Sequence, residues 1–173
     1  MAAFLLAACA QYQVQTTGVF GAPPQVDRLA VWSSIGSVTF LGHKHWSMQD
    51  SFENHFNAAM KQTLEAEKVA AEVRPFRPRS ESPESLAQAE KELKPAARLF
   101  IQPRRYRTMQ GNVQTLDLEL SVHEAATNRR LWQGQMQVEN NMDATTWYEG
   151  GARKLATEIV QALRREGIIR GGG

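Results

Sequence analysis

The segment Thr115-Leu-Asp-Leu-Glu-Leu-Ser-Val-His123 decides the fold, because polar and apolar residues alternate along its whole length. Successive side chains of a strand point to opposite faces of a sheet, so this period predicts a strand with one buried face. Residues 131–139 repeat the alternation beyond a turn at Thr127-Asn128. The two segments are therefore expected to form an antiparallel hairpin.

The sequence on either side of this hairpin predicts further strands and helices. Strands are expected at residues 28–40, 69–76 and 97–107. Apolar residues at helical spacing follow three capping residues, Ser47, Ser82 and Asp143. The predicted order is β-α-β-α-β-β-β-α, which gives an α/β (α+β) fold. Such a fold has a single mixed sheet of about five strands with two to three helices packed on it.

The amino end carries a localisation signal. Residues 2–8 are all apolar, and Leu6-Ala7-Ala8-Cys9 resembles the lipobox of bacterial lipoproteins. The resemblance implies that Cys9, the single cysteine of the chain, is lipidated and becomes the first residue of the mature protein. No Lys or Arg precedes the apolar run, so we expect Met1 to lie inside a longer signal. The alternative is a fragment of a buried helix with a core cysteine.

These features predict the organisation of the whole chain. No charged residue occurs before Asp27, and residues 11–26 carry Gln, Thr, Gly and Pro-Pro with little periodicity. We expect four segments: a partial signal peptide at 1–8, Cys9 with a flexible tether at 9–26, one α/β domain at 27–170 and a disordered tail at 171–173. The resemblance places the protein at the outer membrane, facing the periplasm, because Ala10 is not the aspartate that retains such proteins in the inner membrane.

The globular part resembles the small α/β domain of periplasmic accessory lipoproteins. The similarity covers roughly residues 27–170 and rests on Arg28-Leu-Ala-Val, Ala96-Ala-Arg-Leu-Phe-Ile, Leu116-x-Leu-x-Leu-x-Val122 and Arg130-Leu-Trp-Gln-Gly134. Examples are the amino-terminal domain of the Tol-system translocation protein and the curli-secretion and penicillin-binding-protein-activator lipoproteins. The resemblance implies a class of scaffold and no particular function.

No catalytic or cofactor-binding motif is present in the sequence. Asp117, Ser121 and His123 share one face of the predicted strand, but neighbours on such a face stand about 7 Å apart, too far for a nucleophile and its base. His43 and His45 are weak metal-ligand candidates, to which His55 could add a third imidazole. Their neighbour Lys44 disfavours a cation, and surface histidines are the simpler interpretation. We therefore expect a protein that is not an enzyme and has no cofactor.

An arginine-rich segment is the main candidate for contacts. Possible contact residues are Arg98, Arg104, Arg105, Tyr106 and Arg107, with Trp46 from a separate segment. The leading hypothesis is an accessory or adaptor lipoprotein that binds another envelope protein. The alternative is a module that binds an anionic envelope lipid or glycan through the arginines. A solvated surface is the plain alternative to both. A net charge of +2 does not call for nucleic acid, and the sequence leaves the oligomeric state open.

Overall fold

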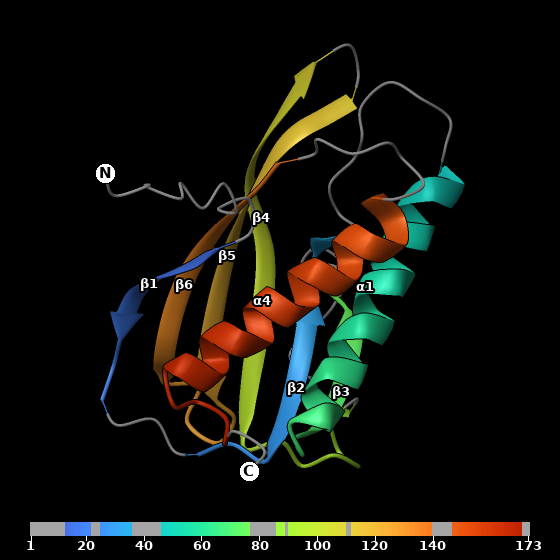
Figure 1. Cartoon of the computed structure of the whole chain (residues 1–173). Helices are drawn as coiled ribbons and strands as arrows, with labels where there is room; N and C mark the ends of the chain where they lie inside the picture. The colour runs from blue at the N-terminus through green and yellow to red at the C-terminus, as the bar shows by residue number, and fades with distance from the viewer. Residues whose placement is uncertain are drawn as a thin grey trace, which may run out of the picture.

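In the computed structural model, the chain forms one six-stranded mixed sheet with helices against one of its faces (Figure 1). The structure describes residues 13–21, 25–35, 46–76, 86–88, 90–109, 112–139 and 147–170. The predicted α/β class is confirmed. The predictions for the signal segment, Cys9, His43, His45 and the tail at 171–173 lie outside the described residues.

The sheet combines a parallel part with an antiparallel part. Its strands are β1 (Val14–Val19), β2 (Arg28–Ser33), β3 (Ala70–Pro75), β4 (Ala97–Met109), β5 (Asn112–Glu124) and β6 (Arg130–Glu139), in the spatial order β1-β6-β5-β4-β2-β3. Strand β2 is parallel to both β3 and β4, and the other pairs are antiparallel. The predicted hairpin is confirmed as β5–β6, and Asn128 adopts a φ of 57° in its turn.

Two long helices and one short π-helix have defined bounds, and residues 86–88, within the helix predicted after Ser82, are helical as well. The three with defined bounds are α1 (Trp46–Ala66), η2 (Trp147–Gly151) and α4 (Ala152–Arg165). The predicted apolar stripe of α1 is confirmed at Phe56, Met60 and Leu64, which are fully buried. Gly167 ends α4 with a φ of 69°, the left-handed conformation that glycine adopts without a steric penalty. Within the described residues, no helix is both long and apolar enough to cross a membrane.

Strand β1 corrects the expectation of a flexible tether over residues 9–26. Val14 pairs with Met136 and Val19 pairs with Trp132, so residues 14–19 form an edge strand beside β6. The indole Nε1 of Trp132 donates a hydrogen bond to Thr16 Oγ1 over 3.3 Å. Folded structure therefore begins by residue 14 and not at residue 27, and the sheet has six strands where about five were expected.

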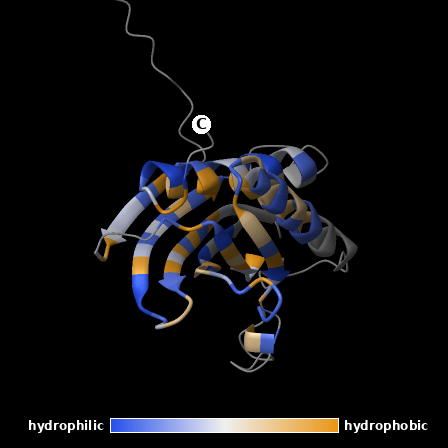
Figure 2. Ribbon diagram, turned by 90° about the horizontal axis from the view of Figure 1, so that it is seen from below, coloured by the Kyte–Doolittle hydropathy of each residue, from blue (hydrophilic) through white to orange (hydrophobic). Residues whose placement is uncertain are grey.

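The two faces of the sheet differ in chemistry. Figure 2 shows α1 and α4 gathered on one side of the sheet, with hydrophobic and hydrophilic residues alternating along the strands. The apolar side chains of the strands, such as Leu29, Leu99 and Leu120, are fully buried in the core cluster that also contains the helix residues. The alternate positions lie on the opposite face, which carries the polar side chains.

Candidate functional site

The face of the sheet turned away from the helices carries polar side chains in register. On β5, Asp117 and Glu119 alternate with the buried leucines. On β6, Gln137 pairs with Asp117 and Gln135 pairs with Glu119. Gln15 of β1 pairs in turn with Gln135. Cross-strand neighbours stand within reach of each other, so amide and carboxylate groups form rows across three strands.

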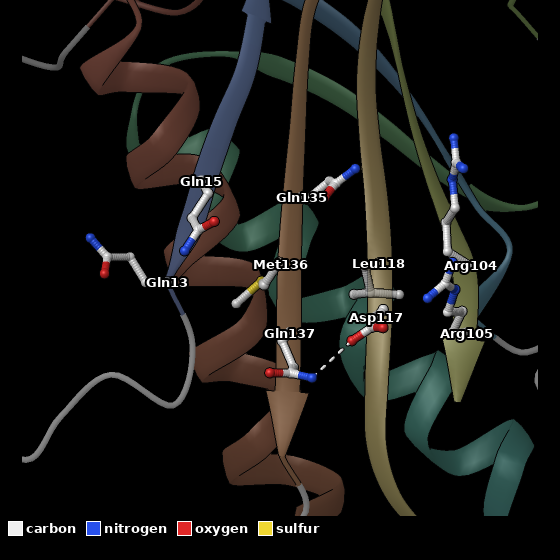
Figure 3. Close-up of a pocket in the computed structure, with 9 residues that line it drawn as sticks. All are labelled: Gln13, Gln15, Arg104, Arg105, Asp117, Leu118, Gln135, Met136 and Gln137. Carbon is white, nitrogen blue, oxygen red and sulfur yellow. Dashed lines mark hydrogen bonds between the residues drawn. The ribbon is translucent and has the colours of Figure 1, made fainter. Parts of the chain in front are cut away.

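A hollow of about 510 Å³ lies where β1, β6, β5 and β4 adjoin (Figure 3). Its polar lining is Gln13, Gln15, Arg104, Arg105, Asp117, Gln135 and Gln137. The Nε2 of Gln137 donates a hydrogen bond of 3.1 Å to Asp117 Oδ1, drawn as a dashed line in Figure 3. The lining therefore offers donors and acceptors together, and it carries charges of both signs.

A β-bulge places Arg104 at this site. The register of β4 with β5 shifts between Pro103 and Arg105, so Arg104 is the extra residue. Its Nε donates a hydrogen bond to Glu119. This hydrogen bond and the negative charge of Glu119 raise the pKa of the Arg104 guanidinium above its usual value. Glu119 also accepts a 2.9 Å hydrogen bond from Gln133 Nε2, so its charge is shared between two donors.

Arg98 lies apart from the hollow, in an ion pair with Glu90. The Glu90 carboxylate is nearly buried, and it accepts hydrogen bonds from Arg98 Nε at 2.8 Å and Nη2 at 2.7 Å. It also accepts a 2.9 Å hydrogen bond from the indole Nε1 of Trp32. Arg98 Nη1 donates to the carbonyl of Ala125 over 3.0 Å. The structure thus gives Arg98 a packing role, holding the residues before β4 against the sheet.

Aromatic side chains cover the β2 end of the same face. The ring centroid of Phe76 lies 6.4 Å from that of Trp32 and 5.8 Å from that of Phe100. Phe100 also contacts the ring of His123, with 5.6 Å between centroids. Trp32 is only 4% exposed, because Glu90 lies over this end. The exposed polar part of the face is therefore formed by β1, β6, β5 and the end of β4.

The predicted contact residues are only partly brought together. Arg104 and Arg105 both line the hollow, and Arg107 is exposed two residues further along β4. Tyr106 lies on β4 between the last two, whereas Trp46 begins α1 and belongs to another element. His55 is exposed on α1, and the described residues contain no group of three potential metal ligands.

The glutamines of the hollow were missed by the sequence reasoning. A signal existed in the alternation Gln133-x-Gln135-x-Gln137, which places three amides on one face of a strand. Gln13 and Gln15 lay in the segment expected to be a tether. Their position beside β6 depends on a strand pairing across more than a hundred residues.

The sequence matches no family model and no curated protein. Among solved structures, PelC from Paraburkholderia phytofirmans, crystallised as a dodecamer, shares 10% identity over 86% of this chain and 96% of its own, with a TM-score of 0.47. A protein from Xanthomonas campestris shares 16% identity over 90% of this chain and 95% of its own, with a TM-score of 0.48. A lipoprotein from Neisseria meningitidis shares 13% identity over 79% of this chain and 96% of its own, with a TM-score of 0.37. These similarities are too low to carry a functional argument.

Proposed function

We propose that this chain is a non-enzymatic lipoprotein of the bacterial outer membrane, attached through Cys9 with its domain in the periplasm. It acts there as an accessory or assembly component that binds another envelope protein. The lipobox-like Leu6-Ala7-Ala8-Cys9 supports the attachment. The proposed activity needs no cofactor.

The polar face of the sheet that the helices do not cover supports the proposed binding of a partner protein. Most sheet faces that are not covered by helices are simply solvated, but this one is hollowed and presents aligned amides and carboxylates from three strands. Backbone and side-chain groups of a partner protein find both donors and acceptors there. The mixture of hydrogen-bonding groups and of charges of both signs suits the binding of a protein surface, since protein–protein interfaces are typically polar at the rim and hold ordered water.

Site-specific photo-crosslinking in living cells tests this docking surface. A photoreactive amino acid replaces Gln135, which lines the hollow, or Gln161, an exposed residue of α4 on the helix side. We expect a discrete crosslinked protein adduct from position 135 and none from position 161. Adducts from both positions, or from position 161 alone, would place the partner elsewhere and contradict the docking surface.

A second candidate function is the binding of an anionic envelope ligand through arginine residues. One observation favours it: Arg105 and Arg107 are exposed and form no ion pair with another described residue. Arg98 and Arg104 contribute less, because Glu90 and Glu119 already neutralise them.

A further inference from the structure

The attachment point proposed at Cys9 lies close to the folded sheet, because β1 begins at Val14. A fully extended chain advances at most about 3.6 Å per residue, so the five residue steps from Cys9 to Val14 span at most about 18 Å. A long flexible tether would let the domain turn freely above a membrane. A connection this short restricts which end of the domain faces the lipid.

The chain enters β1 from one particular end of the sheet. Val14 pairs with Met136, and Met136 pairs with Leu118, so these three residues mark one level across the sheet. Gln13, the residue before β1, lines the same hollow as Arg104 and Arg105. The described chain therefore begins, at Gln13, on the side of the sheet where the β4–β5 hairpin lies.

This hairpin projects beyond the rest of the sheet, as Figure 1 shows. From Leu118 to Asn112, β5 continues for six residues, which corresponds to about 20 Å at the usual rise of a strand. The projection is as long as the maximum reach of the connection to Cys9. A domain anchored at Cys9 can therefore bring the hairpin to the membrane surface, with the turn at Asn128 on the far side.

Arg105 and Arg107 lie on this projecting part of the hairpin. Arg105 pairs in register with Asp117, and Arg107 pairs with Thr115. Both side chains are exposed, and Asp117 instead accepts a hydrogen bond from Gln137. Guanidinium groups bind phosphate oxygens well, and basic residues near an anionic lipid surface are attracted to it.

We propose that the β4–β5 hairpin docks on the membrane and that Arg105 and Arg107 bind the phosphates of lipid headgroups. The surface orients the anchored domain, so that the turn at Asn128 points away from the lipid. This inference rests on the proposed attachment through Cys9, and it assigns the anionic ligand of the second candidate function to the membrane itself.

A chemically tethered form of the chain tests the orientation without cellular lipidation. Cys9 is the only cysteine, so a maleimide lipid couples the full chain to vesicles at that residue alone. Vesicles of phosphatidylcholine with phosphatidylglycerol are compared with vesicles of phosphatidylcholine alone. Amide hydrogen exchange is measured over residues 104–109 and 112–116 at the hairpin, and over 124–130 at the opposite turn.

On the anionic vesicles we expect exchange at the hairpin to slow by about threefold or more, with no change at residues 124–130. The double variant Arg105→Gln/Arg107→Gln should lose this slowing. The matched variant Arg129→Gln/Arg130→Gln, which removes two arginines from the far turn, should keep it. Raising the salt concentration should weaken the protection, because exposed charges are screened.

Three results would overturn the docking proposal: no slowing at the hairpin, equal slowing at both ends, or protection that survives loss of Arg105 and Arg107. A failure of the attachment itself is recognised separately. It appears as membrane association of the Cys9→Ala chain in cells, while the tethered vesicles still report the orientation of the domain.

Discussion

The ion pair between Glu90 and Arg98 shows how one buried carboxylate ties a connecting segment to the sheet. The Glu90 side chain is 6% exposed and that of Arg98 is 21% exposed, so water screens the pair only partly. Removing one charge from such a pair leaves the other without a partner in a poorly solvated place. The same carboxylate also accepts the hydrogen bond of the Trp32 indole, which couples β2 to the pair.

We expect Glu90→Gln to lower the free energy of unfolding by about 2–3 kcal/mol, below the usual cost for a fully buried pair because Arg98 keeps some water contact. Urea denaturation measures the change. The control is Glu149→Gln, which removes the exposed pair with Arg153 and should cost at most about 0.5 kcal/mol. Equal losses in the two variants would show that the Glu90 pair does not stabilise the domain.

At the scale of the element, β1 is held to the sheet by a contact that requires glycine. A Cβ atom added at Gly134 would lie 2.6 Å from Trp132 Cη2 and 3.1 Å from Val14 Cγ1. Trp132 is fully buried, so its indole cannot move aside without disturbing the core. Because Gly134 has no side chain, the indole of Trp132 and the side chain of Val14 both pack against its backbone.

Gly134→Ala should therefore destabilise the domain by about 1–3 kcal/mol through overpacking. The amides of Val14–Val19 should exchange faster, since β1 is an edge strand whose sheet contacts are all to β6. Thermal unfolding and hydrogen exchange measure the two effects. Gly150→Ala is the matched control, because a Cβ there meets no atom within 4 Å. If Gly134→Ala is as stable as this control, the Trp132 contact does not hold β1.

Periodicity predicted most elements because their signals are local. The alternation at Leu116, Leu118 and Leu120 and the four-residue spacing of Phe52, Phe56 and Met60 both reflect a buried face that each segment forms by itself. Strand β1 has no such signal, since only its first residue, Val14, is buried and the rest are polar or partly exposed. Its pairing with β6 is a long-range contact that local patterns do not encode.

At the candidate site, the ion pairs of the arginine-rich segment are also tertiary contacts that local sequence patterns do not predict. The sequence placed Arg98, Arg104, Arg105 and Arg107 on one strand and could not tell which of them are neutralised. The partner Glu90 comes from the preceding connection, and Glu119 reaches Arg104 only because a bulge shifts the register of β4. Arg105 and Arg107 form no ion pair with another described residue, and this difference from Arg98 and Arg104 depends on tertiary structure.

At the scale of the whole molecule, the proposed attachment at Cys9 and the position of β1 would together determine how the domain is presented. Lipid chains on Cys9 would hold the protein stably, because several acyl chains bind a bilayer far more strongly than one. The arginines of the hairpin add only about 1 kcal/mol each, which is too little to keep the protein at the membrane without the anchor. Cys9 should therefore decide where the protein resides, and the hairpin should decide how it is oriented.

We accordingly expect Cys9→Ala to move the protein from the membrane fraction to the soluble fraction of fractionated cells. Arg105→Gln/Arg107→Gln should stay with the membrane, as should the matched variant Arg129→Gln/Arg130→Gln. Fractionation followed by immunoblotting measures the distribution, and mass spectrometry of the native protein should find a diacylglyceryl group on Cys9. A native protein without lipid, or a Cys9→Ala chain that remains in the membrane fraction, would remove the basis for the proposed location.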